Sequence, residues 1–354
     1  MKIGKISENV LKRSVLKYIH KSNEEVIKGA GEDCAFLKWK QEGIGVSTQT
    51  FTLPIEEAAS YAVYAAANNL AAGGMKVKAA TIAVTLPKDA EEVRLQELMK
   101  QADKACTELS IHIVGGHTEV TEGVNTPIIT VTAFGEPLTA DFSAMMEVRD
   151  AGQKGFWQSE NLKGRTGLSV IMTKWIGLEG TAILAKEKEA ELLTRYPSFI
   201  VRQAKGFDKH LPILPEAATA VMSGVCAMHD VRYGGIFGAL FELSKRTGVG
   251  LSIDLKKIPV KQETIEICEF FDLNLYELLS GGCLLMIAED GEALLGALHK
   301  ENIPAEIIGK TIAGNDKIVI NGEETRYMEP AKPDEILKVK FDSDEKVGLQ
   351  ERND

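Results

Sequence analysis

The feature that most constrains the fold is an alanine-rich stretch at residues 56–74, EEAASYAVYAAANNLAAGG. Its residues favour a helix, and their small side chains let that helix pack close to a sheet or to another helix. Gly73 and Gly74 then predict its end. Asn68 and Asn69 stand just before them. Because a buried amide is costly unless it is hydrogen bonded, these asparagines either satisfy a helix terminus or face a ligand, and their position favours the ligand.

Apolar runs around this helix predict an α/β (α+β) fold. After a helix at residues 7–19, the first half reads strand, strand, helix, strand, helix, strand, strand. The second half has a similar layering, with strands expected at residues 167–174, 225–228, 252–255, 280–287 and 305–313. We therefore expect mixed sheets flanked by helices in two domains. The expected divisions are residues 1–150, residues 151–333 and a charged, frayed tail at residues 334–354.

The composition excludes several function classes. A formal net charge of -10 over 354 residues, with no block rich in lysine and arginine, argues against binding to nucleic acid. No segment approaches the run of about 18 apolar residues that a membrane-spanning helix needs. The five cysteines lie far apart and form no CxxC pair, which argues against a zinc ribbon or a disulfide framework. We expect a cytoplasmic protein that acts away from membranes.

A candidate ligand site follows from residues 111–122, IHIVGGHTEVTE. This apolar strand is expected to break at its glycine pair and to present polar side chains at a strand end, where open α/β sheets bind ligands. The residues concerned are Gly115, Gly116, His117, Thr118 and Glu119. The alternative is a Gly-Gly turn with solvated side chains, and this stretch alone favours neither. Three earlier polar breaks, GEDCAF, STQTF and NNLAAGG, favour the site.

These four breaks in this order, with ISENVLKRSV ahead of them and HDVRYGG and SGGCLLMIA behind, resemble the AIR-synthase-related (PurM-like) superfamily. The resemblance covers residues 5–313 and is nearest to the HypE-like hydrogenase maturation proteins. It implies a two-domain PurM-like fold, a homodimer built through the first-domain sheets, and an ATP site lined by carboxylates that bind Mg²⁺. It also implies a role in cofactor or metalloenzyme maturation, with a maturation partner protein.

The same resemblance assigns roles residue by residue. Catalytic roles fall to Asp33 and His117, and Asp33 matches a metal-binding acid of the family. Apart from the resemblance, His117 with Glu32, Asp33 or Glu119 could hold a transition metal, and the alternative is that these are polar loop groups. Cofactor-binding roles fall to Gln49, Asn69, Gly115, Gly116, Thr118, Asp230, Arg232, Gly234 and Gly235. However, Gln49, Asn69 and His117 stand where the family motifs have acids. Since Mg²⁺ prefers carboxylate oxygens, three of the four expected metal ligands are missing.

Two hypotheses follow from this mixture of matches and departures. The first is a dimeric enzyme that uses ATP to activate an oxygen of a carbonyl- or carbamoyl-type substrate by phosphoryl transfer. The second is a non-catalytic dimer whose ATP and magnesium site has degenerated, and the missing acids favour it. In both hypotheses the protein is a homodimer. Without pairing of the first-domain sheets, as the family resemblance implies, an apolar strand at residues 128–131 would present an exposed sheet edge.

Arg232 adds a further hypothesis about how the proposed enzyme would bind its anionic ligand. A guanidinium can grip a phosphate or carboxylate through two parallel hydrogen bonds, so Arg232, with help from Lys174, could replace part of the work of magnesium. The alternative is that Arg232 pairs with a surface carboxylate or lies in solvent. Thr181, after a glycine-flanked segment, is expected to cap a helix whose start could bind an anion.

Overall fold

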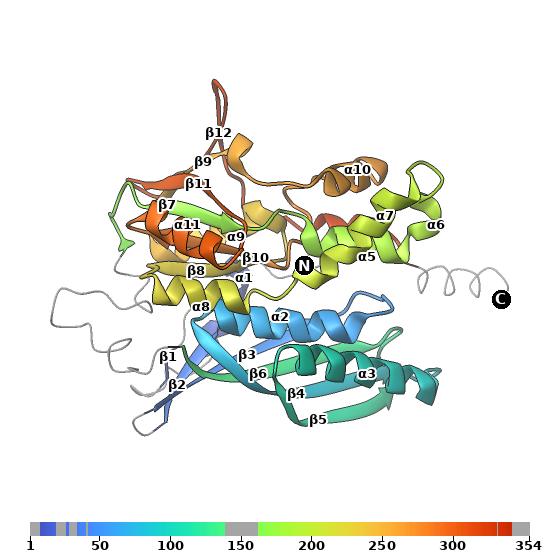
Figure 1. Ribbon diagram of the computed structural model, residues 1–354. Helices are drawn as coiled ribbons and strands as arrows, with labels where there is room; N and C mark the ends of the chain where they lie inside the picture. Colours follow the sequence, from blue (N-terminus) through green and yellow to red (C-terminus); the bar gives the residue numbers. More distant parts are fainter. Residues whose placement is uncertain are drawn as a thin grey trace.

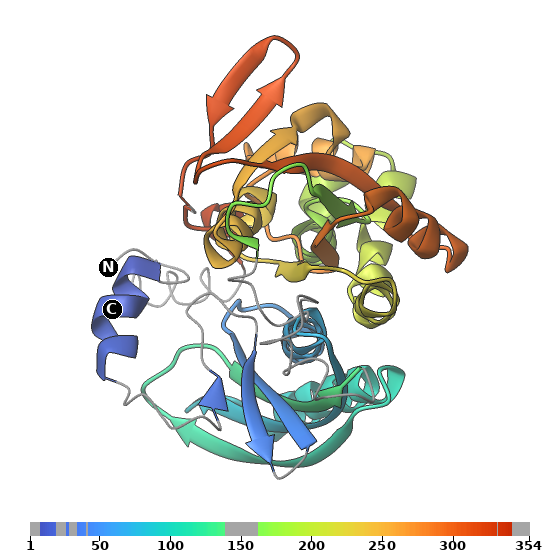
Figure 2. The same cartoon turned by 90° about the vertical axis from the view of Figure 1, so that its left-hand side faces the viewer.

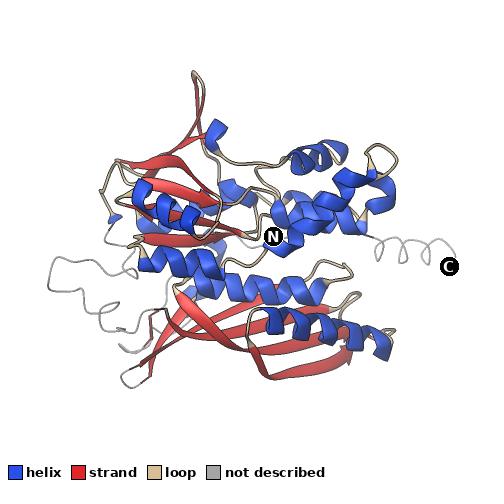
Figure 3. Ribbon diagram, viewed as in Figure 1, coloured by secondary structure: helices blue, strands red, loops and turns tan. Residues whose placement is uncertain are grey.

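The structure is a computed structural model that describes residues 8–18, 26–27, 34–39, 42–138, 162–330 and 332–341. Glu32, Asp33 and the domain boundary expected near residue 150 lie outside the described residues. Two mixed sheets, each covered by helices, form two α/β units that pack against each other (Figure 1, Figure 3). This arrangement confirms the predicted fold class.

The first sheet has six described strands in the order β1-β2-β3-β6-β4-β5. Its neighbouring strands are antiparallel except β4 and β5, which are parallel. The elements of this unit are α1 (Glu8–Ser14), η1 (Leu16–Tyr18), β1 (Val26–Ile27), β2 (Ala35–Trp39), β3 (Glu42–Phe51), α2 (Ala58–Ala72), β4 (Met75–Pro87), α3 (Glu92–Glu108), β5 (His112–Thr121) and β6 (Ile128–Pro137). α2 and α3 cover one face of the sheet (Figure 1).

The alanine-rich stretch forms α2, which lies between the two sheets (Figure 1). Nearly all of its side chains are buried, because its alanines let it contact β3 and β6 on one side and β8 (Ala227–Val231) and α8 (Leu214–Met222) on the other. Gly45 of β3 and Gly135 of β6 allow α2 to approach the sheet closely. A Cβ atom would lie 3.0 Å from a methyl group of Leu70 at Gly45 and 3.1 Å from one at Gly135. The helix ends before Gly73 and Gly74, as predicted, and Gly74 has a φ of 72°.

β5 runs unbroken from residue 112 to residue 121, so the break expected at Gly115 and Gly116 is wrong. Its parallel pairing with β4 explains one of the glycines. A Cβ atom on Gly116 would lie 2.0 Å from the carbonyl oxygen of Ile82, a clash that only glycine avoids. The polar residues expected in a loop therefore lie within a strand at the edge of the described sheet.

β6 lies inside the first sheet, between β3 and β4, so the exposed edge expected at residues 128–131 is also wrong. Ile129 and Val131 are buried on the face that α2 covers. β5 takes the exposed edge position instead, and Val114 and Val120 are 62% and 61% exposed there. The periodic pattern of β6 revealed a strand but could not reveal its neighbours in the sheet.

The second sheet has seven described strands in the order β13-β12-β9-β11-β7-β10-β8. α9 covers one face of it, and α8 and α11 cover the other. The elements are β7 (Ser169–Thr173), α5 (Leu178–Glu187), α6 (Glu189–Leu192), α7 (Ser198–Lys205), η3 (Gly206–His210), α8, β8 (Ala227–Val231), α9 (Gly235–Thr247), β9 (Gly250–Asp254), η4 (Leu255–Lys257), α10 (Gln262–Phe270), β10 (Cys283–Ala288), α11 (Gly291–Lys300), β11 (Ala305–Ile312), β12 (Lys317–Asn321), β13 (Glu324–Tyr327) and η5 (Glu335–Lys338). The hairpin β12–β13, which the sequence pattern did not predict, projects from this sheet (Figure 2). None of the helices in the described ranges is long and apolar enough to cross a membrane.

Two further expectations about the second unit are wrong. Thr181 lies inside α5, where its hydroxyl bonds Thr264 Oγ1 at 3.0 Å, and Gly177 takes the N-cap position with a φ of 68°. The charged tail was expected to be frayed over residues 334–354, but residues 334–341 are packed, and residues 342–354 lie outside the described residues. Asp334 is 4% exposed and accepts hydrogen bonds from the backbone N–H groups of Gly234 and Leu279, at 2.7 Å and 3.0 Å. Ile336 nearby is fully buried, so this segment belongs to the core.

Candidate functional site

Gln49 and Asn69 lie on the helix-covered side of the first sheet. Side chains alternate along β3, so Ser47, Gln49 and Phe51 share the face toward α2. Ser47 Oγ accepts a hydrogen bond of 2.8 Å from Asn69 Nδ2, and Phe51 stacks on Tyr61 of α2 at a centroid distance of 5.9 Å. Asn69 is only 9% exposed. Its amide is therefore engaged inside the first unit.

Asn68 was expected from its position to face a ligand. In the structure it joins the two units instead. Its Nδ2 donates to the carbonyl oxygen of Leu211 at 2.7 Å, and its Oδ1 accepts from the backbone N–H of Ile213 at 3.0 Å. Both ends of a buried amide are thus satisfied, which offsets the cost of removing it from water. The asparagine pair has a structural explanation in this fold.

The pairing register separates the expected site residues of the first sheet. Gln49 pairs with Val131, Val131 pairs with Ile82, and Ile82 pairs with Gly116, so one row runs across four strands. Three strand spacings separate the ends of this row by roughly 14 Å. The side chain of His117, one residue further along β5, alternates to the face that α2 does not cover. One ion therefore cannot contact both Gln49 and His117.

His117 forms its own local pair on the exposed face of β5. Its Nε2 lies 3.2 Å from Glu119 Oε2, and the two side chains are 68% and 53% exposed. Within the described part of the chain, no group of three histidine, cysteine, aspartate or glutamate residues could hold a metal ion. Mg²⁺ takes oxygen ligands, usually one or two carboxylates, and Glu32 and Asp33, two of the three expected metal ligands, lie outside the described residues.

Arg232 is the site residue whose surroundings differ most from expectation. It is 8% exposed and forms a bidentate ion pair with Glu179 at the start of α5, through Nε and Nη2, at 3.3 Å each. Burial alone would lower the pKa of Arg232, but Glu179, together with Tyr233 and Asp230, outweighs burial and raises it. Arg232 therefore makes to Glu179 the two parallel hydrogen bonds that it was expected to make to a ligand. The alternative, a surface carboxylate, is also wrong, because Glu179 is 2% exposed.

Two buried hydrogen-bond donors remain beside this pair. Arg232 Nη1 and the Tyr61 hydroxyl have no hydrogen-bond partner among the described residues. Both residues border Phe51: the guanidinium carbon of Arg232 lies 5.7 Å from the Phe51 ring centroid, and the Tyr61 ring stacks on the same residue. Burial, reinforced by Glu57, raises the pKa of Tyr61, which keeps its hydroxyl protonated. We call Phe51, Tyr61, Glu179 and Arg232 the interdomain cluster.

Glycines hold the backbone of the interdomain cluster in place. A Cβ atom on Gly281 would lie 2.1 Å from Glu179 Oε2, so this glycine leaves room for the carboxylate. Gly235 has a φ of 61°, and a Cβ atom there would lie 2.3 Å from the carbonyl oxygen of Tyr276. Gly234, which was expected to bind a cofactor, donates its backbone N–H to Asp334. Asp230 lies on β8 and is half-buried.

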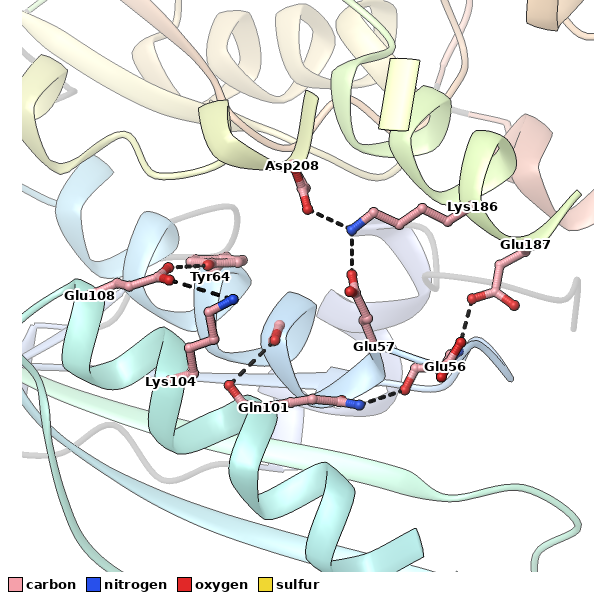
Figure 4. Close-up of polar contacts among 10 residues, drawn as sticks. Glu56, Glu57, Tyr64, Gln101, Lys104, Glu108, Lys186, Glu187 and Asp208 are labelled. Carbon is pink, nitrogen blue, oxygen red and sulfur yellow. Dashed lines mark hydrogen bonds and ion pairs between the residues drawn. The ribbon is translucent and has the colours of Figure 1, made fainter. Parts of the chain in front are cut away.

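Figure 4 shows a second set of contacts between the units, centred on Lys186 of α5. Its Nζ contacts the Glu57 carboxylate of the first unit and Asp208 Oδ2 at 2.5 Å. Burial lowers the pKa of Lys186, but its hydrogen bonds to Asp208 and Glu57 outweigh burial and raise it overall. Beside it, Glu187 Oε1 accepts from the backbone N–H of Glu56 at 2.9 Å.

Lys174, which was expected to assist a nucleotide, is committed to the second unit. Its Nζ lies 2.5 Å from Glu216 Oε1 and donates to the carbonyl oxygens of His210 and Pro212. Lys174 and Glu216 are 8% and 3% exposed. The ammonium group already has three acceptors, so it cannot also hold a ligand without breaking this arrangement.

Two family models match this chain in succession. Residues 31–136 match the N-terminal domain of AIR synthase related protein, and residues 165–321 match its C-terminal domain. The chain belongs to the AIR synthase related family. A putative hydrogenase expression/formation protein of Methanocaldococcus jannaschii is 24% identical over 330 residues, which are 90% of this chain and 91% of the relative. Carbamoyl dehydratase HypE of Cupriavidus necator is 26% identical over 257 residues, 72% of this chain and 67% of that protein.

Solved structures agree with this family fold. HypE in complex with ATP matches with a TM-score of 0.66 and 15% identity, covering 95% of this chain and 97% of that one. The HypE-HypF complex matches with a TM-score of 0.65 and 20% identity, covering 84% and 93% of the two chains. At these identities the likeness establishes the two-domain PurM-like fold of the family.

Three members of the interdomain cluster were not predicted from the sequence as site residues: Phe51, Tyr61 and Glu179. Phe51 ends the break STQTF but is apolar. Glu179 lies between two glycines, and an acid in the first turn of a buried helix is a signal for a charged partner. Tyr61 was hidden in the alanine-rich helix as one of its large residues. Neither Glu179 nor Tyr61 lies in a polar break, which was the signal used to select candidates.

Proposed function

We propose that this protein is an ATP-binding, HypE-like member of its family that acts in the maturation of a metalloenzyme. The main support is the fold shared with HypE in complex with ATP along nearly the whole chain. Relatives described as hydrogenase expression/formation proteins and carbamoyl dehydratases support the maturation role. The HypE-HypF complex supports a maturation partner protein. The proposed compartment is the cytoplasm, because the five cysteines lie far apart in the sequence and form no CxxC pair.

The proposed chemistry is phosphoryl transfer from ATP to the oxygen of a carbonyl- or carbamoyl-type substrate. Such catalysis consists mainly of positioning and charge stabilisation. Arg232 supplies a fixed positive charge where the two units meet, and its Nη1 retains N–H groups that could donate to an oxygen acceptor. Tyr61 supplies a second donor across Phe51. Glu32 and Asp33, two of the expected metal ligands, lie outside the described residues, and we assign no step to Mg²⁺.

The second candidate function is a non-catalytic dimer with a degenerate ATP site. Its support is the amide of Asn69, which stands where the family motif has an acid and is buried against Ser47. Incubation with ATP, followed by chromatography of the nucleotides, separates the candidates. The enzyme predicts ADP formation that falls to background in Asp33→Ala. The non-catalytic dimer predicts the same background rate for both proteins.

We further propose that the protein is a homodimer formed through the first sheet. The support is the strand β5, an exposed edge that carries Val114 and Val120, together with the sheet face that α2 and α3 leave uncovered. Rows of threonine hydroxyls line this face, with Thr48 bonded to Thr132 and Thr50 to Thr130 at 3.0 Å. Light scattering at low micromolar concentration should give about twice the chain mass of 38.6 kDa. A 38.6 kDa species alone would remove this part of the proposal.

A further inference from the structure

A pocket of about 320 Å³ lies in the second unit, between the first turn of α9 and the projecting hairpin β12–β13. One wall is aromatic: the rings of Phe237 and Tyr276 stack with centroids 5.2 Å apart and planes inclined by 14°. Val319 and Met328 from the hairpin side add apolar lining. Figure 2 shows the hairpin projecting from the rest of the second sheet. We call this space the hairpin pocket.

Each positively charged side chain among the described residues that line the hairpin pocket is paired with a carboxylate. Lys332 lies 2.8 Å from Glu329 and 3.6 Å from Glu277, and both acids also line the pocket. Arg326 pairs with Glu324 at 2.8 Å. Three carboxylates, Glu277, Glu324 and Glu329, thus surround the two cations Arg326 and Lys332. The resulting excess of negative charge disfavours an anionic ligand.

The start of α9 is likewise closed to anions, although helix starts commonly bind them. The N–H of Gly234 donates to Asp334 Oδ2 at 2.7 Å, and the N–H of Phe237 donates to the carbonyl oxygen of Tyr276 at 3.4 Å. The chain's own groups thus occupy these donors. What the pocket retains is an aromatic surface and amide groups.

The side-chain amides of Asn274 and Asn321 determine which hydrogen-bonding groups a ligand of this pocket should carry. Asn274 Oδ1 accepts from the backbone N–H of Tyr276 at 3.2 Å, which orients the side chain and leaves its Nδ2 without a partner among the described residues. Asn321 lines the opposite side at the end of β12. A ligand that stacks on the aromatic wall can therefore also present a hydrogen-bonding edge to an amide.

We propose that the hairpin pocket binds a small, uncharged planar ring that carries an amide-type hydrogen-bonding edge. The ring stacks against the Phe237–Tyr276 wall, and its edge bonds Asn274. The volume lies at the lower end of the range for ligand pockets, which suits a single ring or two fused rings rather than a complete nucleotide. This site is separate from the interdomain cluster and does not depend on ATP binding.

Titration of the full chain with nicotinamide, nicotinate and N-acetyltryptophanamide, followed by saturation-transfer NMR, tests this proposal. Nicotinamide and nicotinate have the same ring, but nicotinate is an anion. Nicotinamide should bind saturably, with a dissociation constant on the order of millimolar, as expected for so few atoms. Nicotinate should bind more weakly. Tyr276→Ala should weaken nicotinamide binding by about two- to tenfold, the range expected for one aromatic contact.

Two variants keep this test independent of folding. Tyr276→Phe retains the ring and should bind normally, and Phe199→Ala removes a 51% exposed aromatic side chain of α7 outside the pocket and should also bind normally. Circular dichroism checks that each variant is folded. Absence of saturable nicotinamide binding, or tighter binding of nicotinate, would overturn the proposal. Binding of N-acetyltryptophanamide alone would also overturn it, in favour of an aromatic side chain from a partner protein.

Discussion

Arg232 and Glu179 form a buried bidentate ion pair at the junction of the two α/β units, with both contacts at 3.3 Å. Arg232 comes from the turn before α9, and Glu179 comes from the first turn of α5. The ring of Phe51, from the first sheet, lies against the guanidinium. This ion pair of the second unit therefore contacts the first unit. Removing either charge should destabilise the contact between the two units.

Arg232→Ala should lower the free energy of unfolding by about 3–5 kcal/mol, because it leaves the Glu179 charge buried without a partner. Urea denaturation measures this loss. Arg195→Ala is the matched control, since Arg195 is half exposed and lies 3.8 Å from Glu269 on the surface. That change should cost at most about 1 kcal/mol. Equal losses in the two variants would contradict the role given to the buried pair.

Asn68→Ala should destabilise the contact between the units. It leaves the carbonyl of Leu211 and the N–H of Ile213 without their partner, at about 1–3 kcal/mol for each buried group. Thermal unfolding of the variant should start at a lower temperature than that of the parent protein. Asn125→Ala, an exposed position before β6, provides the control and should unfold like the parent. An unchanged profile for Asn68→Ala would show that this amide does not hold the units together.

Gly116→Ala and Gly115→Ala form a matched pair within β5. A Cβ atom at residue 116 would lie 2.0 Å from the Ile82 carbonyl oxygen, whereas the nearest atom to one at residue 115 is a Thr81 methyl carbon at 3.6 Å. Gly116→Ala should therefore cost about 1–3 kcal/mol through overpacking, and Gly115→Ala should be nearly neutral. Differential scanning calorimetry compares the two. Equal midpoints would mean that β5 does not approach β4 as closely as the structure places it.

Asp334 should make stability depend on pH near neutrality. Burial raises its pKa from 3.8 to about 7, against the effect of the N–H groups of Ile336, Gly234 and Leu279, which favour the charged form. The folded chain thus holds this proton more tightly than the unfolded chain. The resulting stabilisation is complete below about pH 4 and is lost as the pH rises through about 7.

Asp334→Asn removes this titration. Between pH 5 and pH 8, the free energy of unfolding should therefore fall less in the variant than in the parent protein. Urea denaturation at several values across this range measures both slopes. Other titrating groups are common to the two proteins and cancel in the comparison. Parallel slopes would mean that Asp334 is already ionised at pH 5 in the folded chain.

The sequence was sufficient for the main elements of the fold because their signals are local. The alanines of α2 and the apolar periodicity of β4 and β6 predicted the element types, and the order of helices and strands from β2 to β6 agrees with the structure, whereas the short strand β1 was not predicted. Sheet order is a tertiary property. Residues 128–131 read as an edge strand but lie inside the sheet, because partner choice depends on segments distant in the chain.

The candidate site was harder to predict for the same reason. Gln49 and His117 both follow recognisable motifs, but the alternation of side chains places them on opposite faces of one sheet. The partner of Arg232 lies 53 residues away in a different motif, and no spacing rule connects the two. Asp334 looked like part of a charged tail, yet three backbone N–H groups hold it inside the protein.

Titration calorimetry with a non-hydrolysable ATP analogue, with and without Mg²⁺, tests the proposed ATP binding most directly. Binding to the proposed site predicts a saturable heat signal in the parent protein that is lost in Asp33→Ala and retained in the surface variant Arg195→Ala. The dependence of that signal on Mg²⁺ then reports how much metal the site still uses. A folded parent protein that gives no saturable signal at millimolar nucleotide would contradict the proposal.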